Sequence, residues 1–389
     1  MRELLKPTLL LAVLIFLAGF TSDTTRMDTE SEDRRPITIY NTYGYLDGDE
    51  WVIPMRLWVH TPRRIVERLS TRVTRSIGDL SRREVNTFRS RLRDFAANSR
   101  SRRTVDLTFN QDPDGVQYRI EDLDGNHPRT DQNGIIRGTL RLPVDKAETL
   151  LENQDSENSW LTIEASSGRY SGTGRIQLID PEGVSVVSDI DDTVKITEIP
   201  AGARIVVRNT FFKEEYAAAP GMAKRYNEWK HDEYEDVAFH YVSGAPWQLF
   251  GPISDFLFRE DANFPEGTFH MKSVRKNVLT LSSWRDLREL ATNEKVTYDQ
   301  KVSQISRLMQ HFPDREFILV GDSGEMDPEV YTSIDEMYSD QVKEIYIRDV
   351  VNHRELNPER LDGMTIIPAP TIESGVSQFD GYEAFTDAE

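Results

Sequence analysis

The chain has 389 residues, a mass of 44.8 kDa and a formal net charge of −19. This length allows two domains with separate cores, whereas the acidic balance argues against a nucleic-acid binder, because phosphate backbones are held mainly by Lys and Arg. The absence of Cys excludes disulfides, thiolate metal sites, a cysteine nucleophile and a lipidated cysteine.

The N-terminus has the pattern of an export signal. A basic start, Met1 to Lys6, precedes an unbroken apolar run of twelve residues from Leu9 to Phe20. The run is short for a membrane span, which needs about 20 residues. We therefore predict that residues 1–22 are a signal peptide or N-terminal anchor and that 23–35 are a polar linker. The protein would then be exported, either periplasmic or membrane-anchored in a bacterial envelope. A buried core helix is the alternative.

Residues 36–180 have short alternating segments separated by turn residues, a pattern typical of a small β-sandwich-like domain. The expected strands cover 37–40, 44–45, 51–59, 104–109, 116–120, 134–142, 160–165 and 172–178.

A helical segment, 63–103, interrupts these strands. Its apolar residues recur at helical spacing, and its thirteen Arg and four acidic residues give it a charge of +9. The simpler interpretation is a solvated face that pairs with acidic neighbours in this acidic protein. The other is a face that lies on an anionic membrane.

The most informative stretch is a β-branched apolar run, Val184 to Ser188, that ends in Asp189, Asp191, Asp192 and Thr193. Clustered carboxylates at a strand end are tolerated mainly where a cation or a reaction needs them. Side chains two apart on a strand point the same way, so Asp189 and Asp191 can face one phosphate. An acidic turn or a calcium-binding loop is the alternative.

The second half alternates strands with helices, which predicts right-handed crossovers and a parallel sheet. The expected strands are 238–242, 268–271, 317–322 and 344–347, and the expected helices are 222–229, 247–257 and 299–311. Ligands bind beyond the carboxyl ends of such strands, where Asp189, Ser243 and Asp322 would lie together.

Two further residues complete this set. Lys301 would begin the helix before the last of these acidic strand ends and reach over the site as a point charge. Asp327 follows Asp322 in a loop with two glycines. Each has a simpler alternative: Ser243 as a helix cap, Lys301 as a surface lysine, and the two acids as a turn.

Together, the order Asp-x-Asp-x-Thr, strand-end Ser, Lys and Gly-Asp-x-x-x-x-Asp resembles the haloacid dehalogenase superfamily. The longer strings at 188–197, 241–249 and 320–331 resemble the phosphatidate phosphatases related to the yeast actin-patch enzyme, which include bacterial members. The resemblance covers roughly Pro181 to Pro370. It implies a Rossmann-like parallel sheet of the haloacid dehalogenase type over 181–375, before an acidic tail, 376–389.

The resemblance also implies residue roles. Asp189 would be the nucleophile and Asp191 the general acid and base. Ser243 and Lys301 would hold the phosphoryl oxygens, while Mg²⁺ would be bound by Asp189, the Asp191 carbonyl and Asp322. The supporting residues would be Thr193, Gly244 and Asp327, of which Asp327 would position Lys301 or an outer water.

These roles predict a Mg²⁺-dependent phosphatase acting on a lipid phosphate, most directly phosphatidate, through an aspartyl-phosphate. A soluble phosphomonoester is the alternative substrate, and an inert exported binding module is the alternative function. The apolar insertion between Thr193 and Ser243 would select the substrate. The sequence does not predict the oligomeric state.

Overall fold

The computed structural model describes residues 35–62, 81–95, 97–273 and 294–377. The expected leader and nearly all of the polar linker and acidic tail lie outside these ranges. The same is true of the first part of the helical segment, 63–80. Within the described ranges, no helix combines the length and apolar character that a membrane crossing requires.

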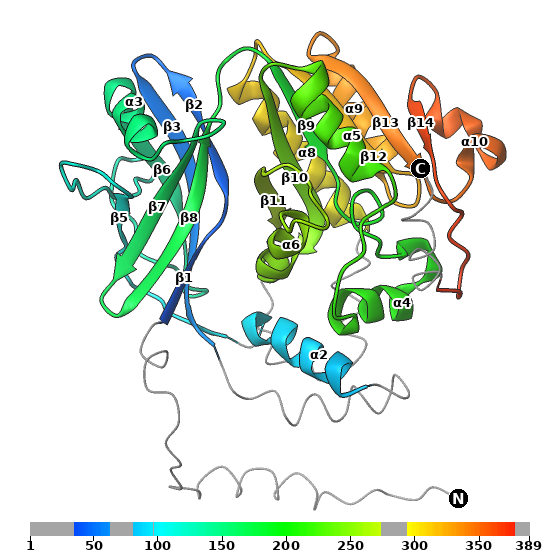
Figure 1. Ribbon diagram of the computed structural model, residues 1–389, viewed down its shortest axis with the longest axis horizontal. Helices are drawn as coiled ribbons and strands as arrows, with labels where there is room; N and C mark the ends of the chain where they lie inside the picture. The colour runs from blue at the N-terminus through cyan, green and yellow to red at the C-terminus, as the bar shows by residue number, and fades with distance from the viewer. Residues whose placement is uncertain (1–34, 63–80, 96, 274–293, 378–389) are drawn as a thin grey trace, which may run out of the picture. The chain divides into compact units, whose positions relative to one another are not determined.

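The second half forms a six-stranded sheet in which every neighbouring pair is parallel (Figure 1). The order across the sheet is β11 (Thr268–Lys272), β10 (Val237–Pro246), β9 (Val184–Ser188), β12 (Glu316–Asp322), β13 (Val342–Asp349) and β14 (Thr365–Pro368). Strand β9 lies inside the sheet and is fully buried, as is typical of a central strand in a parallel sheet. The expected mixed α/β architecture with a parallel sheet is confirmed.

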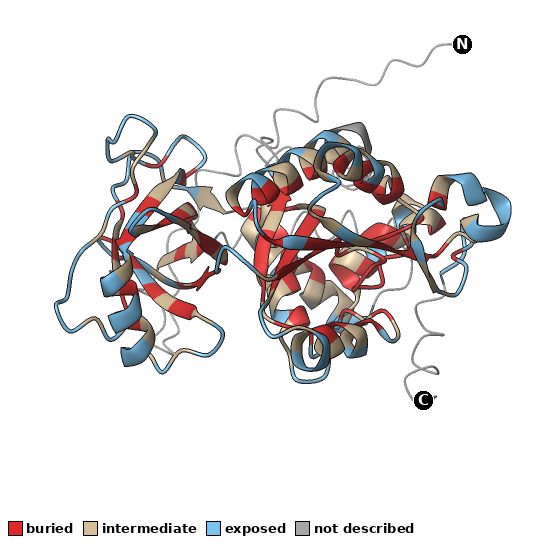
Figure 2. Cartoon of the chain, turned by 90° about the horizontal axis from the view of Figure 1, so that it is seen from above, coloured by how far each residue is buried: buried red, intermediate tan, exposed pale blue. Residues whose placement is uncertain are grey.

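Helices cover both faces of this sheet. Val186 belongs to a core with α5 (Met222–Glu228) and α6 (Phe250–Leu257), whereas Val187 belongs to a core with α8 (Glu294–His311) and α9 (Asp327–Tyr338). Successive strand residues point to opposite faces, so one strand contributes to both cores. Figure 2 shows the buried strands in red between helices with exposed outer surfaces.

The first half forms an eight-stranded sheet around β3 (Glu50–Thr61), which pairs antiparallel with four other strands. Those are β1 (Arg35–Ile39), β2 (Thr42–Asp47), β4 (Asn98–Ser99) and β6 (Ile135–Pro143), and the sheet continues through β8 (Tyr170–Leu178), β7 (Trp160–Ser167) and β5 (Asp106–Phe109). A helix that we did not expect, α3 (Val144–Asn153), follows β6. The β-sandwich remains a prediction.

The expected strand at 116–120 is wrong. This segment makes only an isolated bridge, between Tyr118 and Leu107, and forms no extended ladder. Two turns account for the break, because Asp112 and Asp122 bind backbone amides of the residues that follow them. Local hydrogen bonds of this kind compete with a strand ladder.

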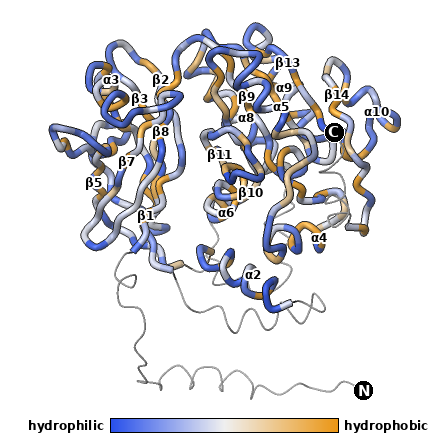
Figure 3. The backbone as a smooth tube through the Cα atoms, viewed as in Figure 1, coloured by the Kyte–Doolittle hydropathy of each residue, from blue (hydrophilic) through white to orange (hydrophobic). Residues whose placement is uncertain are grey.

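The described part of the Arg-rich segment is α2 (Arg82–Phe95), which is mostly hydrophilic in Figure 3. It begins with a capping box, in which Ser81 and Glu84 exchange hydrogen bonds of 2.8 and 3.1 Å. Its apolar face, Phe88, Leu92 and Phe95, is part of the core around α5 and α6. A helix inserted in the first half of the chain therefore completes a core of the second half.

We predict that Phe88→Ala lowers the free energy of unfolding by about 3–5 kcal/mol, because a fully buried ring is replaced by a cavity. The Phe88 ring stacks on Phe212 at a centroid distance of 4.3 Å. Urea denaturation measures the change, and Asn86→Ala, at an exposed position of the same helix, should stay within about 0.5 kcal/mol. Equal stability of the two variants would contradict the packing.

Candidate active site

The site is built on the carboxyl ends of β9, β10 and β12. Asp189 directly follows β9, and its amide donates to Val320 O on the neighbouring strand (2.8 Å). Asp322 is the last residue of β12, and Ser243 lies near the end of β10. Parallel strands end at one edge of a sheet, so these three residues from distant parts of the chain meet there.

Lys301 joins the acidic residues of this edge. Its Nζ donates to Asp189 Oδ1 (2.7 Å) and to Asp327 Oδ1, and it lies 3.7 Å from Glu325 Oε2. Burial opposes a charge on Lys301, but its acidic neighbours raise the pKa of the lysine well above its usual range. The expectation that Lys301 begins its helix is wrong, because the lysine lies inside α8, Glu294–His311.

A cluster of three carboxylates could hold a divalent cation. One oxygen from each of Asp189, Asp322 and Glu325 lies within 4.8 Å of the others. Oδ2 of both Asp189 and Asp322 is buried without a hydrogen-bond partner among the described residues. Buried oxygens of this kind need a donor or a cation, and an all-oxygen set suits Mg²⁺.

The pKa values of this cluster favour a bound cation. Burial, with the charge of Asp327 and other neighbouring carboxylates, raises the pKa of Asp322 well above its ordinary value. Burial also raises the pKa of Asp189, against the opposing charge of Lys301, and raises that of Glu325 to about 7. A cation among these oxygens would lower all three pKa values, because it favours the ionised forms.

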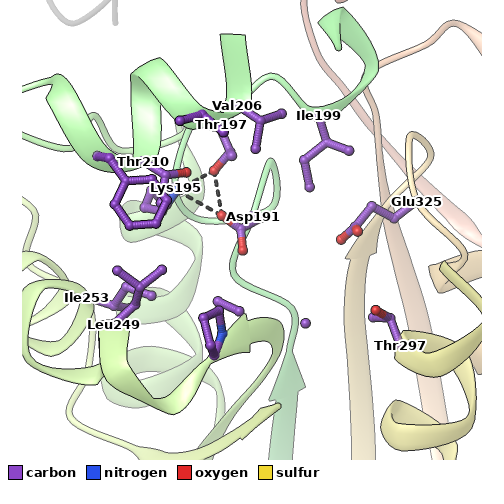
Figure 4. Close-up of a pocket in the computed structure, with 15 residues that line it drawn as sticks. Asp191, Lys195, Thr197, Ile199, Val206, Thr210, Leu249, Ile253, Thr297 and Glu325 are labelled. Carbon is purple, nitrogen blue, oxygen red and sulfur yellow. Dashed lines mark hydrogen bonds and ion pairs between the residues drawn. The ribbon is translucent and has the colours of Figure 1, made fainter. Parts of the chain in front are cut away.

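Asp191 has a lysine of its own. Lys195 Nζ lies 2.8 Å from Asp191 Oδ1, Thr197 Oγ1 donates to the same oxygen (2.6 Å), and Ser243 Oγ donates to Oδ2 (3.3 Å). Burial would raise the pKa of Asp191, but the charge of Lys195 and the hydrogen bonds from Lys195 and Thr197 outweigh burial and lower it. Figure 4 shows Lys195 and Thr197 bound to Asp191 at the pocket.

The turn after β9 is fixed by Asp192, which has a φ of 58°. Its carboxylate accepts hydrogen bonds from the amides of Thr197 (2.8 Å), Glu198 (2.6 Å) and Ile199 (2.6 Å). Thr193, expected to brace this turn, is buried, and its hydroxyl has no partner among the described residues. The turn brings Lys195 back to Asp191, so the ion pair between these two residues becomes part of the site.

An apolar pocket opens beside Asp191. Its walls include Ile199, Val206, Val207, Phe211, Leu249 and Ile253, and Glu325 and Thr297 lie across from Leu249 and Ile253 (Figure 4). Gly244 also lines it, and a Cβ at this position would meet Thr297 Cγ2 at 2.8 Å. The glycine therefore allows α8 to approach the end of β10 closely.

Sequence reasoning missed Lys195, Thr197, Asp192 and Glu325. All four lie within the strings that carried the family resemblance, 188–197 and 320–331. The spacing of Asp191 and Lys195, four apart and on either side of a turn, was the available signal. The available signal for Glu325 was its position between Asp322 and Asp327 in a loop that contains glycine.

Comparisons with known proteins match part of this chain, and the family match includes the candidate site. The family described as "Phosphatidate phosphatase APP1, catalytic domain" matches residues 184–349. Phosphatidate phosphatase APP1 of Saccharomyces cerevisiae is 32% identical over 200 residues, which are 50% of this chain and 32% of the yeast protein. An uncharacterized protein of Schizosaccharomyces pombe, C29B5.04c, is 27% identical over 184 residues, 46% of this chain and 27% of that protein.

The chain thus covers about a third or less of the length of these relatives. A solved carbohydrate esterase structure has 11% identity and a TM-score of 0.19, over 80% of this chain and 88% of the esterase, and carries no argument about the fold. The matched family falls on the parallel sheet and its carboxylate edge. Residues 184–349 of this chain are thus similar to the phosphatidate phosphatase APP1 catalytic domain.

Proposed function

We propose that this chain is a Mg²⁺-dependent phosphatase with a haloacid dehalogenase-type catalytic domain, which hydrolyses phosphatidate to diacylglycerol and phosphate. The observation that carries the proposal is the convergence of Asp189, Asp322 and Glu325 on one point beside Lys301. The family match supports a phosphatase, and the pocket beside Asp191 suits an apolar leaving group.

In this mechanism one oxygen of Asp189 attacks phosphorus, and the bond from phosphorus to the ester oxygen breaks. Asp191 donates a proton to that oxygen, so diacylglycerol leaves as an alcohol. Water then attacks the aspartyl-phosphate, Asp191 takes its proton, and inorganic phosphate leaves. Lys301 and Ser243 stabilise the phosphoryl oxygens. Mg²⁺ at Asp189, Asp322 and the Asp191 carbonyl, with Glu325 nearby, would supply charge neutralisation.

Lys195 affects the step in which Asp191 donates a proton to the leaving ester oxygen. It keeps Asp191 ionised and oriented while no substrate is present. A phosphate dianion beside Asp191 favours its protonated form, because like charges raise the pKa of a carboxyl group. Lys195 and Thr197 are therefore positioning residues for Asp191.

The location in the cell is a separate proposal and rests on the sequence alone. The signal-like residues 1–22 favour an exported protein in the periplasm or anchored to a membrane. The exposed arginines of α2 favour contact with an anionic membrane surface, where a lipid phosphate would be available. Arg83 and Arg208 instead form ion pairs with Glu214 (3.9 Å) and Glu84 (3.7 Å), as a solvated face would.

We predict that Asp189→Asn reduces phosphate release from phosphatidate micelles below detection, because an amide cannot form the acyl phosphate. EDTA should abolish release by the unmodified protein, and added Mg²⁺ should restore it. Asp340→Asn, at an exposed position after α9, is the matched control and should keep full activity. Turnover by Asp189→Asn would remove the nucleophile from the mechanism.

The same assay separates the substrates and the functions. Phosphatidate, glycerol 3-phosphate and p-nitrophenyl phosphate at equal concentration distinguish a lipid phosphatase from one for soluble monoesters. An inert binding module would bind a phosphate ester and release no phosphate from any of the three.

We further predict that Lys195→Met lowers kcat for phosphatidate roughly 10- to 100-fold, because Asp191 loses the partner that positions it. The release of p-nitrophenol from p-nitrophenyl phosphate in the first turnover should change by only about twofold, since this leaving group needs little protonation and the shared hydrolysis of the aspartyl-phosphate comes after it. Thr197→Val should act in the same direction and less strongly. Lys343→Met, which removes a lysine paired with Glu316 outside the site (2.6 Å), serves as the control.

The comparison of the two substrates distinguishes positioning from folding. A general structural defect would lower both rates by the same factor. That result would contradict the role assigned to Lys195.

A further inference from the structure

A second cavity, of about 370 Å³, is lined by both sheets and shares no residue with the pocket beside Asp191. Its lining includes three arginines: Arg56 on β3, Arg137 on β6 and Arg307 on α8. None of its lining residues is Asp or Glu, although the protein has a net charge of −19. A cationic cavity in an acidic protein needs a physical explanation.

Two of these arginines face each other directly. The antiparallel register of β3 and β6 places Arg56 opposite Arg137, so both side chains project from the same face of the sheet. Like charges directly opposite each other destabilise a strand pair. Burial and the charge of Arg137 lower the pKa of Arg56 to about 10. Because Arg137 is exposed to water, the cost of this arrangement falls mainly on the partly buried Arg56.

No carboxylate of the described residues forms an ion pair that would offset this cost. Arg56 Nε is buried and has no hydrogen-bond partner among the residues that the structure describes. Asp131 acts favourably on Arg56, but its Oδ1 already accepts hydrogen bonds from the amides of Asn133 (2.8 Å) and Ile135 (2.9 Å). The charge of Asp131 is therefore partly compensated by the backbone amides of its own turn.

Ring contacts explain only part of the cluster. The guanidinium carbon of Arg56 lies 4.8 Å from the ring centroid of Trp247 and 5.7 Å from that of Tyr40. These cation–π contacts use the flat face of the guanidinium. Arg56 also has a side-chain hydrogen bond with Tyr40, but its Nε stays without a partner among the described residues, and the ring contacts do not involve Arg137 or Arg307.

We propose that this cavity binds a phosphate group, either inorganic phosphate or the headgroup of an anionic phospholipid. Guanidinium groups present pairs of N–H donors that match the oxygens of a phosphate, and three of them line the cavity. The inference does not depend on the phosphatase function, because no lining residue belongs to the carboxylate cluster. Trp247 lies just after the end of β10, so an occupant would lie near the catalytic edge.

The test uses the full chain in EDTA, which keeps divalent cations from the carboxylates. Isothermal titration with inorganic phosphate measures the free anion. Co-sedimentation with vesicles of phosphatidylcholine and phosphatidylglycerol measures the headgroup. The test variant is Arg137→Gln with Arg307→Gln, since both side chains are exposed and the core is spared. Arg141→Gln is the control, because Arg141 is on the same strand and is paired with Glu50 (3.3 Å).

We expect the double variant to bind at least about tenfold more weakly, as the loss of two charge-assisted contacts implies, and Arg141→Gln to bind as the unmodified chain does. Weakening in the titration alone identifies free phosphate as the occupant, and weakening with vesicles alone identifies the lipid headgroup. Equal binding by the double variant, an equal loss in Arg141→Gln, or no binding in both arms would overturn the proposal.

Discussion

The carboxylate edge of the parallel sheet depends on the ion pairs of the buried Lys301 ammonium group. The ammonium group binds Asp189 after β9 and Asp327 at the start of α9, and Glu325 lies 3.7 Å away. Removing carboxylates from water is costly unless a partner compensates them. Without this lysine, carboxylates from two separate segments would repel each other at the place where the parallel strands end. The lysine thus permits both the burial of these groups and their proximity.

A second lysine divides the site into two parts. Lys195 forms an ion pair with Asp191, and Lys301 forms one with Asp189. The two acids of one motif therefore have different electrostatic surroundings. Their pKa values move in opposite directions, lowered for Asp191 and raised for Asp189. These directions are the reverse of what the proposed reaction needs, because a nucleophile must be ionised and a general acid must carry a proton. A divalent cation beside Asp189 would favour the ionised nucleophile, and a phosphate dianion beside Asp191 would favour the protonated acid.

The sequence allowed the parallel sheet and the meeting of Asp189, Ser243 and Asp322 to be predicted, because strand ends follow from apolar runs and from the crossover rule. Lys195 and Glu325 could not be assigned, since their positions depend on a turn fixed by the carboxylate of Asp192 and on a loop after β12.

The segments against which α2 and residues 116–120 pack could not be predicted from the sequence either. The apolar stripe of α2 predicted a buried face without showing that the core it joins is that of the second half. Alternation at 116–120 predicted a strand that local hydrogen bonds of the flanking turns replace. Patterns in a sequence thus specify which faces are buried, whereas the contacts between distant segments decide what buries them.

The central claim is that Asp189, Asp322 and Glu325 surround one divalent cation that serves the reaction. Anomalous X-ray diffraction from crystals soaked in Mn²⁺, an oxygen-seeking substitute for Mg²⁺, tests it most directly. The account predicts one strong anomalous peak among these three carboxylates, beside Lys301. Its absence at Mn²⁺ concentrations that support turnover, or a peak that excludes Asp189, would contradict the account.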